Sequence, residues 1–351
     1  MGVEVEFFSI RNDTFSHRVI KPKKHLREKG EKFTSDPTIG TEYNSKVFYS
    51  VREAFFLLKS SLRKYQLRNY HHTKRSGVAG IAFHGSWADK AAGTHIHIGI
   101  GRKDISKKKA SEIANYIHDH LPFIIAVSTN SPVWEYMPGR ISSSRMHYTG
   151  EDYCMPTLKG KLETDHHNEL NFNNYIGKDS TLEIRICDSN IPEFICASLL
   201  IINVLANASL RKRRQSNILT DGHYLAARKS AIKHGAKSML YWNNKPVTFA
   251  KYIDNFFNYY RHDIKKLDVP DQIFDVFRYL KKGYNGSTIT KRSCTNLKRK
   301  HPRAWKRYFA RRYAIAIEEL LNGQTLKVFA SHLGVRLPNV EKVRLGRYVW
   351  K

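Results

Sequence analysis

Three short segments of this chain each carry two ionisable residues separated by one apolar residue. The pairs are Glu4 with Glu6, His95 with His97, and Glu183 with Arg185. Side chains of a β-strand alternate between its two faces, so each pair points to one face while its Val, Ile and Leu neighbours point to the other. Carboxylates and imidazoles bind metal ions, and a set rich in carboxylates favours Mg²⁺ or Mn²⁺ over zinc. The pattern predicts a divalent-metal site on the polar face of a sheet.

An ordinary surface strand also alternates polar and apolar residues, and this alternative explains any one of the three segments. Surface strands usually mix Thr, Lys, Ser and Gln with acids, whereas these strands carry only paired acids, paired imidazoles or an acid with an arginine. The metal site is therefore the better interpretation of the set.

Two further segments add candidate residues. Asp36 and Glu42 flank Gly40, whose missing side chain permits a tight turn that would place Glu42 at the start of a strand. Arg145 follows three serines within residues 123–150, a stretch with turn signals and little periodicity that we predict to be an ordered functional loop.

The elements that would position these residues are strands in the first part of the chain and helices after Pro192. The periodicity predicts strands within 1–8, 77–84, 94–101 and 168–188, and helices at 51–68, 104–120, 192–212, 221–235, 247–264, 271–282 and 302–322. Residues 9–35 read as a basic loop or ragged hairpin. The stretch from Ile191 to Ala208 is apolar but interrupted by polar residues, which indicates a buried helix and no membrane span.

Five segments resemble, in order, the motifs of the glutamate–cysteine ligase type 2 group and its relatives, the phage COOH–NH₂ ligases and amidoligases. They are Gly-Val-Glu-Val-Glu from Gly2, Asp36 with Gly-Thr-Glu at 40–42, Gly-Thr-His-Ile-His from Gly93, Asn-Ser-Pro at 130–132 with Ser144-Arg145, and Thr-Leu-Glu-Ile-Arg from Thr181. A weaker likeness, at Ala226 to Arg228 and His234 to Ala236, extends the resemblance to about residue 265.

The resemblance implies an α+β fold: a curved antiparallel glutamine-synthetase-like catalytic sheet, with helices on its outer face. It implies an ATP- and Mg²⁺-dependent (or Mn²⁺-dependent) ligase that joins a carboxylate to an amine through an acyl phosphate. Small amino acids and amines are the implied substrates, a glutamate-like acid among them.

The residues that match the family motifs receive their roles from the same resemblance. Arg145 and Arg185 match positions that hold phosphate and developing negative charge, so they are both catalytic and ATP-binding candidates. Asp36 matches a position that could accept the proton of the amine. His97 could act in support of a ligand. The metal-ligand candidates are Glu4, Glu6, Glu42, His95 and Glu183.

The composition is that of a globular protein with a strong basic excess. The chain has 60 Lys and Arg against 31 Asp and Glu, a formal net charge of +29, which favours a polyanionic partner or substrate. Four cysteines without a Cys-x-x-Cys pair fit reduced thiols in a cytoplasm, that of the host if the protein is viral. The oligomeric state cannot be read from the sequence.

The chain divides by composition into a predicted catalytic domain, 1–265, and a basic helical C-terminal region, 266–351. Residues 325–347 read as a short helix, a turn at Gly334 and a second helix bearing Lys342, Arg344 and Arg347, which predicts a helix-turn-helix. This region is the candidate contact for nucleic acid, against the alternative of a small helical cap with a solvated basic face.

Two other functional classes compete with the ligase. A single-strand DNA endonuclease of the HUH type would use His95 and His97 as a metal site and a Tyr-x-x-Lys nucleophile, at Tyr175 or Tyr279. A non-catalytic nucleic-acid-binding protein would explain the charge. Neither class requires the paired acids on the strands, and the ligase does.

Overall fold

The structure is a computed structural model that describes residues 1–11, 30–36, 39–76, 78–101, 104–175, 179–348 and 350. The predicted basic loop over 9–35 lies partly outside these residues. Lys178, the lysine of the Tyr-x-x-Lys motif that begins at Tyr175, also lies outside them.

Seven strands of the described chain form one sheet in which every pair is antiparallel. The spatial order is β2-β3-β1-β5-β9-β8, and β4 pairs with the second half of β1. The strands are β1 (Gly2–Arg11), β2 (Lys32–Asp36), β3 (Gly40–Asn44), β4 (Val78–Ala82), β5 (Gly93–Ile98), β8 (Leu170–Asn173) and β9 (Thr181–Asp188). The three strands with paired ionisable residues, β1, β5 and β9, are therefore adjacent at the centre of the sheet.

Two small hairpins and a set of helices complete the fold. The hairpins are β6 (Val133–Trp134) with β7 (Met137–Pro138), and β10 (Met239–Trp242) with β11 (Lys245–Thr248). The helices are α1 (Val51–Ser76), α2 (Lys107–His118), α3 (Leu121–Ser128), α4 (Ser144–Tyr148), α5 (Gly150–Tyr153), α6 (Pro192–Leu210), α7 (Asp221–His234), the 3₁₀ turn η2 (Gly235–Lys237), α8 (Phe249–Tyr259), α9 (Arg261–Lys265), α10 (Asp271–Lys281), α11 (Gly286–Lys300), α12 (Trp305–Leu321) and α13 (Leu326–His332).

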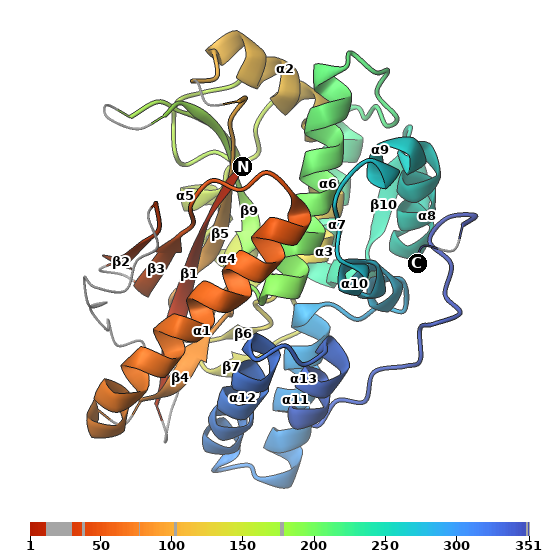
Figure 1. The fold of residues 1–351 in the computed structure, drawn as a ribbon. Helices are drawn as coiled ribbons and strands as arrows, with labels where there is room; N and C mark the ends of the chain where they lie inside the picture. Colours follow the sequence, from red (N-terminus) through yellow and green to blue (C-terminus); the bar gives the residue numbers. More distant parts are fainter. Residues whose placement is uncertain are drawn as a thin grey trace.

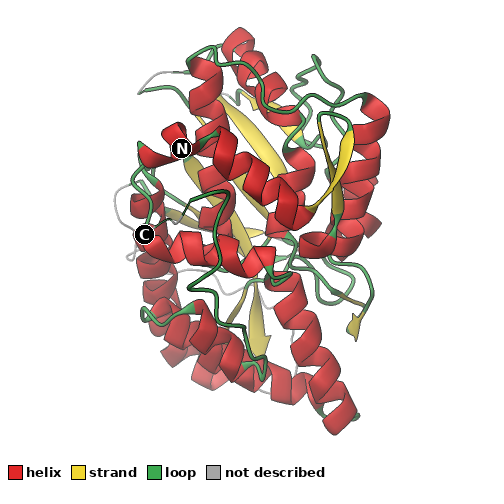
Figure 2. Cartoon of the chain, turned by 90° about the vertical axis from the view of Figure 1, so that its right-hand side faces the viewer, coloured by secondary structure: helices red, strands yellow, loops and turns green. Residues whose placement is uncertain are grey.

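The apolar face of the sheet packs against helices. Val3, Val5 and Phe7 of β1 are buried, and the Phe7 ring lies 5.3 Å from that of Tyr65 on α1. Helix α1 runs across the sheet beside α6, as Figure 1 shows, while α12 contacts β4 and α3 contacts β9. Figure 2, turned by 90° from Figure 1, shows the strands with helices around them. One continuous hydrophobic core joins these layers.

Helix α6 is long and apolar enough to cross a membrane by length and composition alone. Most of it is buried inside the fold, including Ile195, Leu199 and Ile202. It is the core helix that the interrupted apolar run predicted.

Two helices, α3 and α11, differ from what the sequence predicted. The loop predicted over 123–150 begins with helical residues instead, because 123–128 belong to the wholly buried helix α3. Pro122 lies in the first turn of this helix, where its missing N–H costs nothing. Helix α11, capped by the Asn285 side chain, had no predicted counterpart.

The predicted helix-turn-helix over 325–347 is wrong. Helix α13 ends at His332, and the described residues that follow it form no second helix. Leu337 and Val340 are buried, and Pro338 between them has no N–H to donate to a helical turn. The segment is an irregular tail that packs on the protein.

This tail ties the end of the chain to helices on the far side of α6. Arg278 of α10 donates to the Val343 carbonyl, and the Gly346 N–H donates to Asp254 of α8. Helix α12 is attached to the sheet by hydrogen bonds between the Tyr313 hydroxyl and the backbone of Phe83, the residue after β4. The hydrophobic core runs through the predicted boundary at residue 265, which stays a prediction.

Candidate active site

The antiparallel register brings the paired residues of β1, β5 and β9 into one row on the polar face. Glu4 lies opposite His95 across β1 and β5, and His97 lies opposite Glu183 across β5 and β9. Directly opposed residues of an antiparallel pair share a face, so the row is a consequence of the register.

Glu4, His95 and Glu183 form a compact cluster of potential metal ligands. Their ligand atoms all lie within 4.8 Å of one another. The Nδ1 atom of His95 is 3.5 Å from Glu4 Oε2 and 3.4 Å from Glu183 Oε1. Two carboxylate oxygens and one imidazole nitrogen at this spacing suit a hard divalent cation.

The Glu183 carboxylate is fixed by its neighbours. Arg185 donates to its Oε1 at 2.6 Å, and the amides of Asn171 and Asn173 on β8 donate to its Oε2 at 3.0 and 3.4 Å. Burial acts to raise the pKa of Glu183, but the nearby His95 and Arg185 outweigh it and hold the pKa below its ordinary value. The carboxylate is thus charged and ready to bind a cation.

Glu4 is held charged in a similar way. Burial opposes its ionised form, yet hydrogen bonds and charge from His95 and His97 lower its pKa below the ordinary range. The Nε2 atom of His97 lies 3.5 Å from Glu4 Oε2, while its Nδ1 pairs with the Thr181 hydroxyl at 3.0 Å. His97 therefore orients Glu4, and Thr181 orients His97.

Glu6 and Glu42 lie beside the cluster without joining it. They are direct register partners across β1 and β3. Glu6 accepts a 2.5 Å hydrogen bond from the Gly93 N–H, and burial, with the charge of Glu42 adding to it, raises its pKa. Glu42 accepts hydrogen bonds from Thr34 and Asn44. Two adjacent carboxylates of like charge are a natural second position for a cation.

The two predicted arginines meet at the edge of the cluster. Arg145 donates to the Arg185 backbone carbonyl at 2.9 Å, and its guanidinium lies 4.0 Å from Asp188. The Nε of Arg185 is buried and has no hydrogen-bond partner among the described residues. A buried, unpaired N–H on a cation next to a metal-ligand cluster fits the oxygen of a phosphate or carboxylate.

A hydrogen-bond network behind Arg145 sets the position of its loop. Asp188 accepts from the Asn130 N–H and from the hydroxyls of Ser131 and Ser143, at 2.7–2.8 Å. The Ser131 hydroxyl also accepts from the Arg145 N–H. The Asn-Ser-Pro segment at 130–132 and the Ser-Ser-Arg segment at 143–145 are thus joined through one aspartate, which fixes the position of the arginine.

Gly93 is needed for this approach. A Cβ on Gly93 would lie 2.8 Å from the Arg145 Nη2 and 3.1 Å from the His95 Nε2. Any larger residue would displace the guanidinium or the imidazole.

Asp36 lies on an outer strand of the sheet. Its backbone ends β2 and pairs with Gly40. Strand β2 is the outermost strand on this side of the sheet, two strands from β1. Its predicted role stays a prediction.

The sequence interpretation missed the residues that support the site. Asn171 and Asn173 alternate with Leu170 and Phe172 in the same single-spaced pattern as the other pairs. That signal was present, and a search for paired amides as well as paired charges would have found it. Asp188 carried no such signal, because its role depends on contacts from two distant segments, 130–131 and 143–145.

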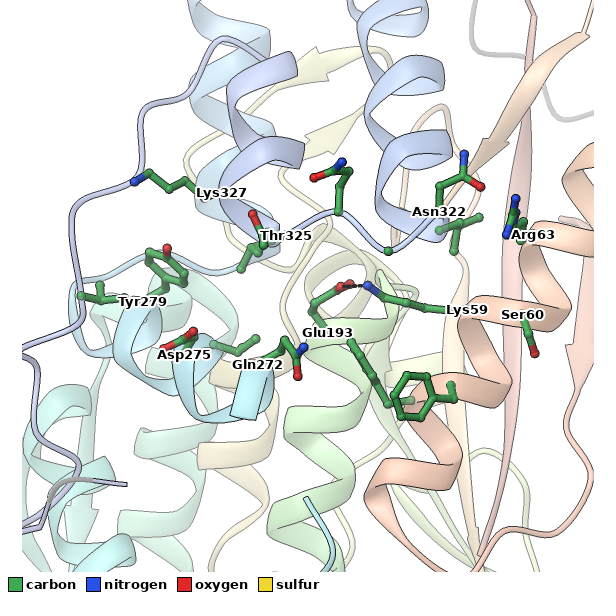
Figure 3. Close-up of a pocket in the computed structure, with 18 of the residues that line it drawn as sticks. Lys59, Ser60, Arg63, Glu193, Gln272, Asp275, Tyr279, Asn322, Thr325 and Lys327 are labelled. Atoms are coloured by element: carbon green, nitrogen blue, oxygen red, sulfur yellow. Dashed lines mark ion pairs between the residues drawn. The ribbon is translucent and has the colours of Figure 1, made fainter. Parts of the chain in front are cut away.

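A larger pocket lies elsewhere, among the helices. It has a volume of about 530 Å³ between α1, α10 and the α12–α13 turn, and none of the predicted site residues lines it. Figure 3 shows Lys59 of α1 paired with Glu193 of α6 in this pocket, with Tyr279 on its wall. The polar face has a small pocket of about 170 Å³ that Glu4, His97 and Thr181 line.

The chain is similar to known proteins both in sequence and in fold. The family model of glutamate–cysteine ligase family 2 matches residues 60–167, which include His95 and Arg145. A protein assigned as glutamate–cysteine ligase 2 in Corynebacterium jeikeium (strain K411) is 42% identical over 53 residues, which are 15% of this chain and 12% of that protein. The chain thus matches a small part of this relative's length. The family resemblance predicted from the motifs is confirmed.

Two solved structures share the fold over most of the chain. The ligase PafA, in complex with the prokaryotic ubiquitin-like protein Pup, gives a TM-score of 0.59 at 11% identity and covers 95% of this chain and 78% of PafA. Glutamate–cysteine ligase of Francisella tularensis, in complex with AMP, gives 0.51 at 11% identity and covers 95% and 91%. The predicted glutamine-synthetase-like fold class is confirmed. These similarities do not support the HUH endonuclease or a nucleic-acid partner.

Proposed function

We propose that this chain, a relative of the glutamate–cysteine ligase 2 family, is an ATP-dependent ligase that joins a carboxylate to an amine. The observation that carries the proposal is the cluster of Glu4, His95 and Glu183 with the unpaired Arg185 Nε beside it. A cation-binding cluster next to a buried arginine is what a triphosphate with bound metal requires.

Glu4, His95 and Glu183 would hold one divalent cation, and Glu6 with Glu42 would hold a second. The majority of oxygen ligands favours Mg²⁺, with Mn²⁺ as the substitute. Bound there, the ions would offset the negative charge of the nucleotide phosphates during transfer. His97, Asn171 and Asn173 would hold the carboxylates in place for them.

The reaction that fits these groups has two steps. An oxygen of the substrate carboxylate forms a bond to the γ-phosphorus of ATP while the bond to ADP breaks. The amine nitrogen then forms a bond to the acyl carbon, phosphate leaves, and the nitrogen loses a proton. Arg185 and Arg145 would stabilise the oxygens that carry negative charge in both steps, because a guanidinium can donate two hydrogen bonds at once.

Asp36 is our proposed acceptor of the amine proton, on the strength of the motif that it matches. The strand that ends at Asp36 also carries Thr34, which donates to Glu42. This placement puts Asp36 on the strand that borders the second cation position.

The proposed substrates are an amino-acid carboxylate and an amine. The relatives are named for glutamate and cysteine, or for a small protein, Pup. A glutamate-like donor acid is therefore the first to try. We also propose a reducing, cytoplasmic location, which the four buried free cysteines support.

The test is release of ADP from ATP with Mg²⁺ in the presence of mixed amino acids and amines. Glu183→Gln and Glu4→Gln should each lower turnover more than about 100-fold, because even supporting residues around a metal contribute 10–100-fold. Glu112→Gln, at an exposed glutamate on α2, is the matched control and should keep wild-type turnover.

If wild-type protein releases ADP and both site variants retain that rate, the metal assignment is wrong. Circular dichroism and thermal unfolding of each variant establish that a lost rate is not lost folding.

A further inference from the structure

A further pocket, separate from the metal-ligand cluster, is lined by basic and neutral polar side chains, without an acidic one. Its volume is about 380 Å³. Three segments form it: the loop that leads to Arg145, the C-terminal end of α7 with the following 3₁₀ turn, and α11 as far as Asn296. The α11 part of this lining belongs to the basic C-terminal region that was predicted to contact nucleic acid, but the pocket itself was not predicted.

Six cationic or titratable basic side chains gather there from segments far apart in the sequence. They are Arg140, Lys233, His234, Lys237, Lys291 and Arg292. No aspartate or glutamate is among the lining residues, and no ion pair joins these six to any carboxylate of the described chain. Basic residues on an ordinary solvated surface are usually interspersed with acids.

The fold holds these like charges close together at a cost. Burial, with the charges of Lys237 and Arg140, lowers the pKa of the half-buried Lys291. Burial, with Lys233 and Lys291, also lowers the pKa of His234. An anion in the pocket would relieve this repulsion.

Neutral hydrogen-bonding groups stand between the cations. Ser142, Ser287, Thr288, Thr295 and Asn296 complete the lining. Lysine and arginine together with hydroxyls and amides are the groups that bind phosphate oxygens.

The basic surface continues along α11 beyond the pocket. Lys298 and Arg299 lie one to two turns past Lys291 and Thr295 on a helix that rises about 1.5 Å per residue, so the basic stretch from Lys291 to Arg299 spans about 12 Å. A ligand with more than one phosphate could use the pocket and this stretch together.

The pocket also lies next to the candidate active site along the chain. Ser142 lines the pocket, and the adjacent Ser143 binds Asp188 in the network that holds Arg145. Arg145 comes three residues after Ser142, so their Cα atoms lie at most about 11 Å apart.

We propose that this pocket binds phosphate groups of a polyanionic ligand, at a site distinct from the metal cluster. The shared chemistry is the phosphate group, and its source is either a small phosphorylated molecule or the backbone of a nucleic acid. The proposal is independent of the ligase activity.

The experiment compares wild type with Lys237→Gln/Lys291→Gln, in buffer with EDTA so that the metal cluster cannot hold phosphate through Mg²⁺. One arm titrates inorganic pyrophosphate by calorimetry. The other arm measures fluorescence anisotropy of a short single-stranded oligonucleotide across a range of salt. The matched control is Lys107→Gln/Lys108→Gln, which removes the same charge from α2, outside the pocket.

We expect the pocket variant to weaken binding in at least one arm while the α2 control does not. For the oligonucleotide, the slope of log K against log salt should become shallower by about 1.4, since each phosphate contact on a single strand contributes about 0.7. Loss only in the pyrophosphate arm identifies a small phosphorylated ligand; loss in the oligonucleotide arm identifies nucleic acid.

Equal effects of the two double variants in both arms would overturn the proposal, because binding would then follow net charge alone. Absence of binding by wild type in both arms would overturn it as well. Loss of ADP release by Glu183→Gln bears on the proposed ligase and leaves this result unchanged.

Discussion

Glu183 is the residue on which the geometry of the metal-ligand cluster depends most. Its two oxygens have different contacts. Oε1 faces His95 and Arg185, and Oε2 accepts hydrogen bonds from the amides of Asn171 and Asn173 on β8. A carboxylate fixed at one oxygen presents the other in a single direction, so a cation meets a site that needs little rearrangement.

Removing one of these amides should weaken metal binding without destroying the fold. Asn171→Leu has nearly the same size and leaves Oε2 with only the longer bond from Asn173. If the ligase proposal holds, the Mg²⁺ concentration for half-maximal ATP turnover should rise about 10–100-fold, the usual effect of such supporting groups. Titration of ADP release with Mg²⁺ measures it.

The control for this change is Asn174→Leu, at an exposed neighbouring position. An unaltered Mg²⁺ dependence of folded Asn171→Leu protein would show that the β8 amides do not orient Glu183.

Among the elements, β5 and β9 depart from regular pairing where the arginines meet. The register shifts between Thr94 and Ile96, so that His97 lies opposite Glu183 while Gly93 lies opposite Asp188. In a regular strand Asp188, five residues after Glu183, would point to the opposite face. The bulge instead lets Asp188 reach the loop of Arg145.

Helices α1 and α6 are joined by an ion pair in the pocket of Figure 3. Lys59 lies 2.7 Å from Glu193, both side chains are almost fully buried, and Glu193 Oε2 has no partner in the described chain. Burial raises the pKa of Glu193, and Lys59 opposes that effect. The pair is a stability determinant of the helical layer that supports the sheet.

Lys59→Met should lower the free energy of unfolding by about 3–5 kcal/mol, because it leaves a buried carboxylate without its cation. The double variant Lys59→Met/Glu193→Gln should recover much of that loss, since no uncompensated charge remains. Urea unfolding measures both. Lys327→Met, an exposed lysine on the wall of the same pocket, is the control and should change stability little. A single variant as stable as its control would contradict the argument.

Two junctions between parts of the molecule each bury a histidine. His84 lies at the end of the sheet and packs against Tyr313 of α12, with ring centroids 4.7 Å apart. His120 pairs with the Tyr252 hydroxyl of α8 and with Ser216. Burial lowers the pKa of each histidine to about 3.

This makes stability depend on pH. In the unfolded chain a histidine has a pKa of about 6.5, so below that pH the unfolded state gains a proton that the folded state excludes. The stability is full above pH 6.5 and falls as the pH decreases toward 3, by up to about 1.4 kcal/mol per pH unit for each histidine.

Urea unfolding at pH 7.5, 6 and 5 measures that slope. His120→Gln should be less stable than wild type at pH 7.5 but should lose stability less steeply with acid, because one excluded proton is gone. His166→Gln, at an exposed position, should keep the wild-type slope. Equal slopes for wild type and His120→Gln would mean that His120 takes up its proton in the folded state.

The features that the sequence predicted correctly are those that depend on local pattern. Strand alternation predicted that Glu4 with Glu6, His95 with His97, and Glu183 with Arg185 each share a face, because the period of two is a local property of the backbone. The family motifs added that these strands belong to one antiparallel sheet. Helix α6 and most helices after it followed from apolar periodicity.

Contacts between distant segments were decided only by the tertiary structure. Three features depend on register and packing between segments far apart in the sequence: which two carboxylates join His95, how a bulge brings Asp188 to Arg145, and that six basic side chains share one pocket. The same holds for the tail after His332: its sequence allowed a second helix, and burial of Leu337 and Val340 around Pro338 selected an irregular path instead. Local propensity is a weak preference, and the hydrophobic contacts of the folded chain outweigh it.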